Sequence, residues 1–325
     1  MKNLCPKIAA LAAALAFLLV PVLGKAQTAS GAPLRIVVPF LAGSGSDVVA
    51  RLIGNELSQR LGQPVVVINQ AGGSGVIATQ MVQRADPDGN TLLLTTTNHV
   101  LLPTSQRDLA FDVVEDFAPI GQVSAGPLVI AANPDLPAKT FPELIAYAKA
   151  NPGKISYATP GVGTVPHLAI ELLCNLTGTK MVAIPYRGGP QAMTDVISGN
   201  VAFYLGTFAS VLPYFDSGKS VPLAITSERR PSFIKNIPTI AEQGVPNYHV
   251  DYWYGFVAPR KTSPERIRQL NAEISAIATS PKVSEILIRQ GFEPKTGTPE
   301  DFRNYMRLEV KRWAEVAKLA GVKPE

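Results

Sequence analysis

The chain has 325 residues, of which 46% are hydrophobic and only 17% are charged. A globular chain of this length usually holds about two domains of roughly 150 residues, each large enough for its own hydrophobic core. The 30 basic and 25 acidic residues give a formal charge of +5, but no clustered basic face stands out, which argues against nucleic-acid binding.

The N-terminus has the three-part pattern of a secretory signal peptide. Lys2 and Lys7 supply its positive region, an apolar stretch covers 8–23, and small residues precede a cleavage site at Ala26. The apolar stretch is shorter than the roughly 20 residues of a membrane span, which argues against the alternative of a retained anchor. We therefore predict an exported protein whose signal peptide, residues 1–26, is removed.

Cleavage changes two properties of the chain. It removes three lysines and no acidic residue, which lowers the formal charge from +5 to +2. A cut after Ala29 would have the same effect. Cys174 then remains as the single cysteine, so no internal disulfide can form, and we expect it to be a small buried side chain on a helix.

Apolar strands alternate with helical patterns from residue 35 to residue 226. Strands are expected at 35–40, 64–68, 91–95, 127–131, 155–159, 181–185, 201–206 and 222–226. Helices are expected at 47–61, 140–150, 165–176, 190–198 and 208–217. Strands that are apolar throughout and alternate with helices are typical of parallel sheets covered on both faces. The predicted fold class is therefore α/β.

The C-terminal third is helical instead. Ser-Pro and Thr-Pro pairs, which suit a capping residue followed by proline at the first helical position, precede expected helices at 265–279, 282–290 and 300–320. The simplest arrangement is a chain that leaves one lobe, builds a second and returns to finish the first.

Two chain crossings, near 119–131 and 247–257, would connect these lobes. The predicted division is lobe 1 over residues 27–125 plus 252–325, and lobe 2 over residues 126–251. Two crossing strands form a hinge, so the sequence predicts a two-lobed protein with a ligand cleft between the lobes.

A glycine-rich turn follows the first expected strand and opens the next helix. Gly43 and Gly45 allow the backbone to approach a ligand closely, and the free N–H groups of a helix start attract an anion. Ser44 and Ser46 add hydroxyl donors. Asp47 is expected to be the helix N-cap rather than a ligand contact, because its charge would repel an acid.

A second turn of the same kind follows the strand at 155–159. Gly161 and Gly163 precede a helix for which Thr164 is the expected N-cap. His167 lies in the first turn of that helix. It either donates a hydrogen bond to a carboxylate or is a packing residue, and the sequence leaves both alternatives open.

Two further strand ends carry candidates, since parallel sheets bind ligands at the carboxyl ends of their strands. Tyr186 and Arg187 follow the strand at 181–185. Arg187 either lines the cleft or is a solvated charge between the lobes. Gly206 and Thr207 end the next strand and form a weaker candidate of the same type.

Signatures of nucleotide binding, catalysis and metal binding are incomplete. Val48 stands where a dinucleotide-binding turn requires its third glycine, and no phosphate-loop lysine follows. The glycines at 72–75 do not form a nucleophile elbow, because Val76 occupies the last glycine position. The three histidines are too far apart for a metal motif. We therefore expect no catalytic residue, metal or cofactor.

Short motifs occur in a fixed order over about nine tenths of the chain. They are 36–40 with Gly43 and Asp47, 69–73, 87–89, 116–119, 151–153, 161–164 with His167, 186–188, 238–242, Trp253 with Gly255, 258–259 and Trp313. This series resembles the substrate-binding proteins of tripartite tricarboxylate transporters, also called the Bordetella uptake gene family.

The resemblance implies a two-lobed, hinge-closing fold of the Venus flytrap type in the periplasm. It implies a small carboxylate ligand, either a di- or tricarboxylate or an aromatic carboxylate, and a two-component membrane permease that receives the loaded protein. We expect a monomer without enzymatic activity. The alternatives are a periplasmic sensor that presents the bound carboxylate to a receptor kinase, and a hydrolase that uses Ser44 or Ser46 with His167.

In such proteins the first and second turns hold the ligand carboxylate. With the two weaker strand ends, the predicted ligand-binding residues are Leu41, Ala42, Ser44, Gly45, Ser46, Gly163, Thr164, His167, Tyr186, Gly206 and Thr207. The family usually has a second glycine where Ser44 stands, and an aspartate is common where Ala202 precedes Phe203 and Tyr204. Leu41 is apolar at a position that can touch the variable end of the ligand. These features favour a carboxylate with an apolar or aromatic body over an amino acid.

Overall fold

The structure is a computed structural model that describes residues 32–186 and 188–322. The predicted signal peptide at 1–26 and its cleavage site lie outside the described residues, and so does Arg187.

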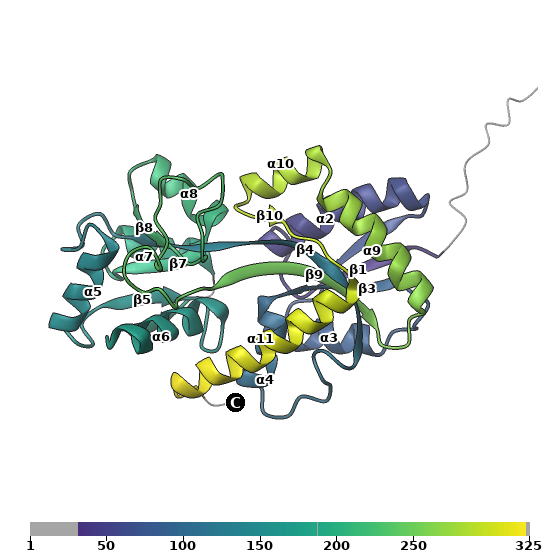
Figure 1. Ribbon diagram of the computed structural model, residues 1–325, viewed down its shortest axis with the longest axis horizontal. Helices are drawn as coiled ribbons and strands as arrows, with labels where there is room; N and C mark the ends of the chain where they lie inside the picture. The colour runs from purple at the N-terminus through teal and green to yellow at the C-terminus, as the bar shows by residue number, and fades with distance from the viewer. Residues whose placement is uncertain (1–31, 187, 323–325) are drawn as a thin grey trace, which may run out of the picture. The chain divides into compact units, whose positions relative to one another are not determined.

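Strands and helices alternate along most of the described chain (Figure 1). The strands are β1 (Leu34–Val38), β2 (Val65–Asn69), β3 (Thr91–Thr96), β4 (Phe117–Ala132), β5 (Ser156–Thr159), β6 (Val182–Pro185), β7 (Phe203–Thr207), β8 (Val221–Ile225), β9 (Asp251–Pro259) and β10 (Glu293–Pro294). The α-helices are α2 (Gly45–Leu61), α3 (Val76–Gln83), α4 (Thr97–Ser105), α5 (Phe141–Ala150), α6 (Val165–Thr177), α7 (Gly189–Ile197), α8 (Phe208–Asp216), α9 (Pro264–Ala278), α10 (Pro281–Arg289) and α11 (Pro299–Leu319). One 3-10 turn, η1 (Gly73–Gly75), precedes α3.

The predicted α/β class is confirmed by the strand pairing. Strand β1 pairs in parallel with β2 and β3, and β5 pairs in parallel with β6 and β7. Two groups of strands can therefore be distinguished. The first strand group contains β1, β2, β3, β9 and β10, the second contains β5 to β8, and β4 pairs with both groups.

Strand β4 is the element on which the two strand groups meet. Its first part, from Phe117 to Pro127, pairs antiparallel with β9, while Leu128 to Ala132 pair with β7 and β8. All sixteen residues of β4 are buried. The predicted chain crossings at 119–131 and 247–257 fall on β4 and on the start of β9, as Figure 1 shows.

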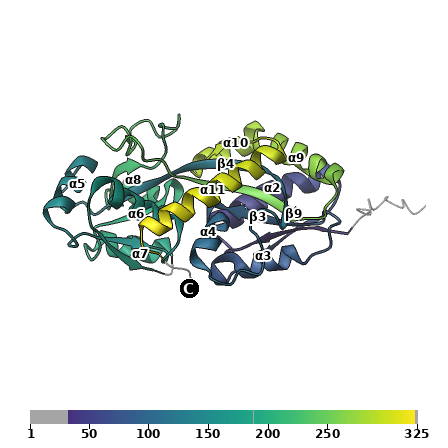
Figure 2. The same cartoon turned by 60° about the horizontal axis from the view of Figure 1, so that its bottom comes forward.

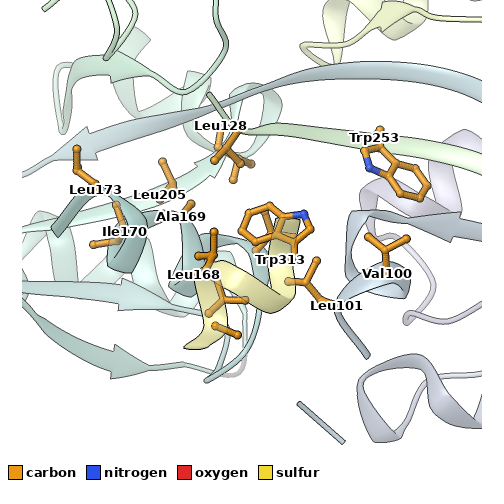
Figure 3. Close-up of a cluster of buried hydrophobic side chains, with 14 of the residues drawn as sticks. Val100, Leu101, Leu128, Leu168, Ala169, Ile170, Leu173, Leu205, Trp253 and Trp313 are labelled. Carbon is orange, nitrogen blue, oxygen red and sulfur yellow. The ribbon is translucent and has the colours of Figure 1, made fainter. Parts of the chain in front are cut away.

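Helix α11 contacts both sides of this arrangement. It packs on α4, α6 and β4, and Figure 2 shows it lying along the strand β4. Trp313 of α11 is fully buried, and Figure 3 shows its indole between Leu101 of α4 and Leu168 of α6. The helix that ends the described chain therefore packs against elements from both ends of β4.

The sequence prediction missed four elements, which are the 3-10 turn η1, the helices α3 and α4, and the short strand β10. Pro103 lies inside α4, where it interrupts the helical sequence pattern. Thr96 caps this helix by accepting a hydrogen bond from the backbone N–H of Asn98 at 3.2 Å. Helix α4 lies beside the cavity described below, so this omission concerns the functional site.

None of the described helices is both long enough and apolar enough to span a membrane.

His99 of α4 is buried and makes the fold sensitive to acid. Its Nε2 lies 2.7 Å from the carbonyl oxygen of Val113, and burial lowers the pKa of the imidazole from 6.5 to about 4, partly opposed by that hydrogen bond and by the charge of Asp112. The unfolded chain therefore binds a proton at His99 between pH 6.5 and 4, whereas the folded chain does not. The contribution of His99 to the free energy of unfolding is therefore full above pH 6.5 and is lost as the pH drops through this window.

The free energy of unfolding of the wild type should therefore fall between pH 7 and pH 4. We predict that His99→Gln, which keeps a donor for Val113, makes this decrease smaller by about 3 kcal/mol. Urea unfolding at pH 7 and pH 4 measures it. If the free energy of unfolding depends on pH in the same way in the wild type and in the variant, the prediction is wrong.

Candidate functional site

A cavity of about 360 Å³ lies between α4, the start of α6, the end of β7 and the start of β9. Its lining residues are Phe40, Ser74, Asn98, Leu101, Leu102, Ser105, Leu128, Pro160, Val162, Gly163, Thr164, Pro166, Tyr204, Leu205, Gly206, Thr207 and Tyr252. These residues come from both strand groups and from β4. No charged side chain occurs among these described lining residues, so the polar groups available are hydroxyls, one amide and backbone N–H groups.

The second glycine turn borders this cavity as predicted. Gly161 and Gly163 have φ angles of +146° and +75°, which favour glycine, and Thr164 is the N-cap of α6, as the sequence predicts. The Thr164 hydroxyl does not cap the helix; it donates to the Gly161 carbonyl at 2.7 Å. The first N–H groups of α6 are therefore not satisfied by their own N-cap side chain.

His167 does not line the cavity; its side chain hydrogen-bonds to the backbone of the second turn. Its Nδ1 accepts a hydrogen bond from the Gly163 N–H at 3.2 Å, and its ring stacks on Tyr157 with the centroids 6.5 Å apart. Burial lowers the pKa of this imidazole, although the charge of Glu171 opposes the shift. A neutral ring can accept at Nδ1, whereas an imidazolium cannot.

The end of β7 forms another wall of the cavity. Thr207 is the N-cap of α8, again without a side-chain capping bond. A Cβ atom at Gly206 would lie only 2.5 Å from Cε1 of Tyr204, so glycine is required for the tyrosine ring to reach the cavity. Burial raises the pKa of Tyr204 to about 12, so its hydroxyl stays a neutral donor at physiological pH.

Helix α4 supplies polar residues that sequence reasoning did not find. Asn98 donates from Nδ2 to the Tyr252 hydroxyl at 3.3 Å and accepts at Oδ1 from the Val165 N–H at 3.4 Å. Ser105 lies at the other end of α4, where a Cβ atom at Gly163 would come within 3.0 Å of it. The signal that could have indicated Asn98 is its place directly after the carboxyl end of β3.

The first glycine turn does not line the cavity in this structure. Of that region only Phe40 lies in the cavity wall, while Leu41 is 73% exposed. The turn residues predicted as contacts and absent from the lining are Leu41, Ala42, Ser44, Gly45 and Ser46. Gly45 and Ser46 lie instead at the Tyr254 hydroxyl, since a Cβ atom on Gly45 would be 2.9 Å from it. Their role in ligand binding stays a prediction.

The predicted capping role of Asp47 is wrong. The N-cap of α2 is Ser44, whose Oγ accepts from the Asp47 N–H at 3.3 Å. Asp47 is the third helical residue, and its Oδ2 accepts from the Gly43 N–H at 2.9 Å. Ser44 directly precedes the first helical residue and caps the helix, while Asp47 at the third helical position bonds back to the turn.

Asp47 therefore places a buried carboxylate at the start of α2. Arg51 and Asn69 also donate to it, at 3.0 and 2.9 Å. Burial raises its pKa, but the hydrogen bonds from Arg51, Gly43 and Asn69, with the charge of Arg51, outweigh burial and keep the pKa lowered. This carboxylate complements the helix dipole of α2 and is paired with the guanidinium of Arg51.

Tyr186 and Ala202 lie away from the cavity. The Tyr186 hydroxyl donates to Asp195 at 2.7 Å, within the second strand group. Ala202 lies just before β7, and Phe203, the first residue of that strand, stacks on Tyr157, whereas the cavity is at the other end of the strand. Ala202, which stands where the family commonly has an aspartate, therefore does not line this cavity.

The residues of the hydrolase alternative, Ser44 or Ser46 with His167, are not brought together at the cavity. Neither the predicted serines nor His167 line the cavity, and the acceptor nitrogen of His167 is occupied by Gly163. No group of three His, Cys, Asp or Glu residues that could hold a metal ion occurs in the described part of the chain.

Comparisons with known proteins show the family of this chain. The family model TctC, described as tripartite tricarboxylate transporter family receptor, matches residues 49–322. Protein BugT of Bordetella pertussis (strain Tohama I) is 36% identical to this chain over 300 residues, which is 92% of each protein.

Solved structures extend the similarity to the fold. The structure titled R. palustris Rpa4515 with adipate has a TM-score of 0.83 and 33% identity, and covers 90% of this chain and 98% of its own. MatC (Rpa3494) from Rhodopseudomonas palustris with bound malate has a TM-score of 0.77 and 28% identity, and covers 88% and 98%. The periplasmic binding protein BugD has a TM-score of 0.79 and 33% identity, and covers 90% and 99%. The predicted family resemblance and the two-lobed binding-protein fold are thereby confirmed.

The Asp47 site gives a testable stability prediction. We expect Asp47→Asn to lower the free energy of unfolding at pH 7 by about 1–3 kcal/mol, because hydrogen bonds to a charged acceptor are lost. A lowered pKa stabilises the fold above the unfolded value near 4, and this stabilisation is lost as the pH falls through the folded value. The difference from wild type should therefore shrink by pH 3 in urea unfolding.

The matched control is Asp108→Asn, an exposed aspartate, which should change stability little at either pH. A destabilisation by Asp47→Asn that is equal at pH 7 and pH 3 would contradict the assigned charge role.

Proposed function

Since this chain belongs to the tripartite tricarboxylate transporter receptor family, whose members are substrate-binding receptors rather than enzymes, we propose that it captures a small carboxylate and delivers it to a two-component membrane permease. The main observation behind the proposal is the cavity of about 360 Å³ bounded by two helix starts whose N-cap threonine side chains make no capping hydrogen bond. Its place of action is the periplasm, reached by export and cleavage after Ala26, as a monomer with lobes divided at 125/126 and 251/252.

The two helix starts supply the attraction for an anion. Thr164 and Thr207 are N-caps of α6 and α8, both line the cavity, and neither caps its helix within the described residues. Ser44, Thr140 and Thr298, in contrast, cap α2, α5 and α11. A carboxylate in the cavity therefore meets the positive ends of two helix dipoles, and at α6 it competes with the Asn98 oxygen for the Val165 N–H.

The remaining lining suits an apolar ligand body. Phe40 and four leucines, Leu101, Leu102, Leu128 and Leu205, face the cavity, and no acidic side chain among the described lining residues would pair with an amino group. Related structures contain adipate and malate. We therefore infer a carboxylate without an amine, with an aliphatic or aromatic body.

The first test is a thermal-shift screen of the mature protein with adipate, malate, succinate, citrate, benzoate and glutamate. A ligand at a hundredfold excess over its Kd stabilises the folded state by about 2.7 kcal/mol, so a true ligand raises the Tm. We expect at least one of the amine-free acids to do so and glutamate not to. A screen in which no acid changes the Tm would overturn the proposal.

The second test concerns the second turn. Thr164→Val removes the hydroxyl that donates to Gly161 and lies 3.2 Å from the Thr159 hydroxyl. We expect it to weaken binding of the best acid by about 1–3 kcal/mol in isothermal titration, because the turn at the start of α6 loses the hydrogen bond to Gly161 that holds its shape.

The matched control is Thr177→Val at the other end of α6, where the hydroxyl donates to Leu173. This variant should bind as wild type does. An affinity unchanged by Thr164→Val would show that the second turn has only a structural role.

A further inference from the structure

A second cavity, of about 520 Å³, lies at the strands that connect the two strand groups. Pro127 of β4 pairs with Asp251 of β9, and both residues line this cavity. The next residue of each strand, Leu128 and Tyr252, lines the cavity of the proposed ligand instead. Successive side chains of a strand point to opposite faces, so the two cavities lie on opposite faces of the crossing strands.

We call the second cavity the hinge pocket, because each strand group supplies one of its walls. The first wall consists of residues 293–295, which contain β10 of the first strand group. The second wall consists of residues 227–232, which follow β8 of the second strand group. The Ser232 N–H donates across the pocket to Oε1 of Glu293 at 3.4 Å. This hydrogen bond joins the two strand groups on the face opposite the ligand cavity.

The charges of the two walls favour the same contact. Residues 227–232 include two arginines and one glutamate, which gives this wall a net positive charge. Glu293 meets this wall directly, whereas Lys295 lies over the ring of Tyr305 in α11, with its Nζ 5.5 Å from the ring centroid. A hydrogen bond to an ionised acceptor is stronger than a neutral one. Glu293 therefore holds the second wall by a charged hydrogen bond.

We propose that the contact between Glu293 and Ser232 is an autoinhibitory latch, which opposes closure of the ligand cavity and lowers the affinity for the ligand. The proposal rests on the proposed function and on closure of the two lobes about the crossing strands. When two lobes turn about the strands that connect them, opposite faces of these strands move in opposite senses. Closure of the cavity around a ligand therefore widens the hinge pocket and separates Glu293 from Ser232.

The latch affects the affinity through the population of the closed state. The apparent Kd equals the Kd of the closed state divided by the fraction of the protein that is closed. Loss of the latch raises this fraction and leaves the ligand contacts unchanged, since neither Glu293 nor Ser232 lines the ligand cavity. The ligand then binds more tightly, which is the opposite of what general damage to the fold would cause.

The first experiment measures the Kd of the best acid of the screen by isothermal titration. Glu293→Ala removes the acceptor, and we expect it to bind the acid about threefold more tightly than wild type, the size of effect that an exposed contact of this kind supplies. Glu293→Gln keeps a neutral acceptor and should lie between wild type and Glu293→Ala. Glu293→Lys faces the positive wall with a positive charge and should bind most tightly.

Glu285→Ala is the matched control. Glu285 is an exposed glutamate of α10, it pairs with Arg289 of the same helix, and it lines neither cavity. This variant should keep the wild-type Kd.

The second experiment makes the latch permanent. In the mature protein, expressed from residue 27, Cys174 is the single natural cysteine and it is buried. The double variant Ser232→Cys/Glu293→Cys can therefore be cross-linked selectively with a one-carbon bis(methanethiosulfonate) reagent. We expect the cross-linked protein to bind the acid at least tenfold more weakly than the reduced protein, and reduction to restore binding at least as tight as that of wild type. The two single variants, treated in the same way, should show no such loss.

The outcomes separate the latch from the proposed function. If no acid of the screen binds the wild type, the proposed function fails and the latch fails with it. If acids bind, but Glu293→Ala binds no more tightly than wild type, the latch alone is overturned. A cross-linked double variant that binds as tightly as its reduced form also overturns the latch and leaves the proposed function intact.

Discussion

The antiparallel pairing of β4 with β9 is the interaction on which the arrangement of the binding site depends. The pairing extends from Phe117 opposite Pro259 to Pro127 opposite Asp251. The next residue of β4, Leu128, pairs with β7 instead. Leu128 and Tyr252 both line the cavity, so the cavity forms at the point where β4 leaves β9.

This transition requires a glycine in β4. A Cβ atom at Gly126 would lie 2.1 Å from the carbonyl oxygen of Gly291, so only glycine allows the segment after α10 to approach the strand. Two irregularities in the β4–β9 register, at Pro119/Gly121 and Gln122/Ser124, come before it. Such bulges bend a strand and increase its twist. These bulges fit a single strand, β4, that pairs with both strand groups.

Helix α11 adds a second connection between the elements beside the cavity. Buried Glu309 accepts from the Trp313 indole N–H at 3.0 Å and pairs with Arg312 at 3.3 Å. Arg312 also donates to the carbonyl of His249, which precedes β9. A buried carboxylate is stable only when it is paired in this way. The network therefore fixes α11 to the start of β9 and holds Trp313 between Leu101 and Leu168, behind the cavity wall.

The sequence predicted those features that depend on local patterns. Apolar strands, helix starts after Ser-Pro and Thr-Pro, and Thr164 as the N-cap of α6 all follow from neighbouring residues, and Gly163 and Gly206 do line the cavity. Helix α4 was missed because Pro103 breaks its pattern. Asn98 and Tyr252 meet only through the tertiary fold, since 154 residues separate them in the sequence.

The two glycine turns, which look alike in the sequence, differ in charge at one equivalent position. In α2 the third helical residue is Asp47, which accepts from the Gly43 N–H; in α6 it is His167, which accepts from the Gly163 N–H in the same way. Both side chains stabilise their turn by a backbone bond four residues back. Asp47 brings a negative charge that is paired with Arg51, whereas His167, with its pKa lowered by burial, brings no charge.

This difference in charge affects how each turn would meet an anion. At α2 a ligand carboxylate would have to approach the buried carboxylate of Asp47, and their repulsion opposes the attraction of the helix dipole. At α6 the dipole is uncompensated, and the acceptor in place at the first N–H is the neutral oxygen of Asn98. An anion can replace a neutral acceptor at a helix start more easily than it can join a fixed carboxylate. The two turns therefore differ in charge although they have the same glycine spacing, and it is the turn at α6 that borders the cavity.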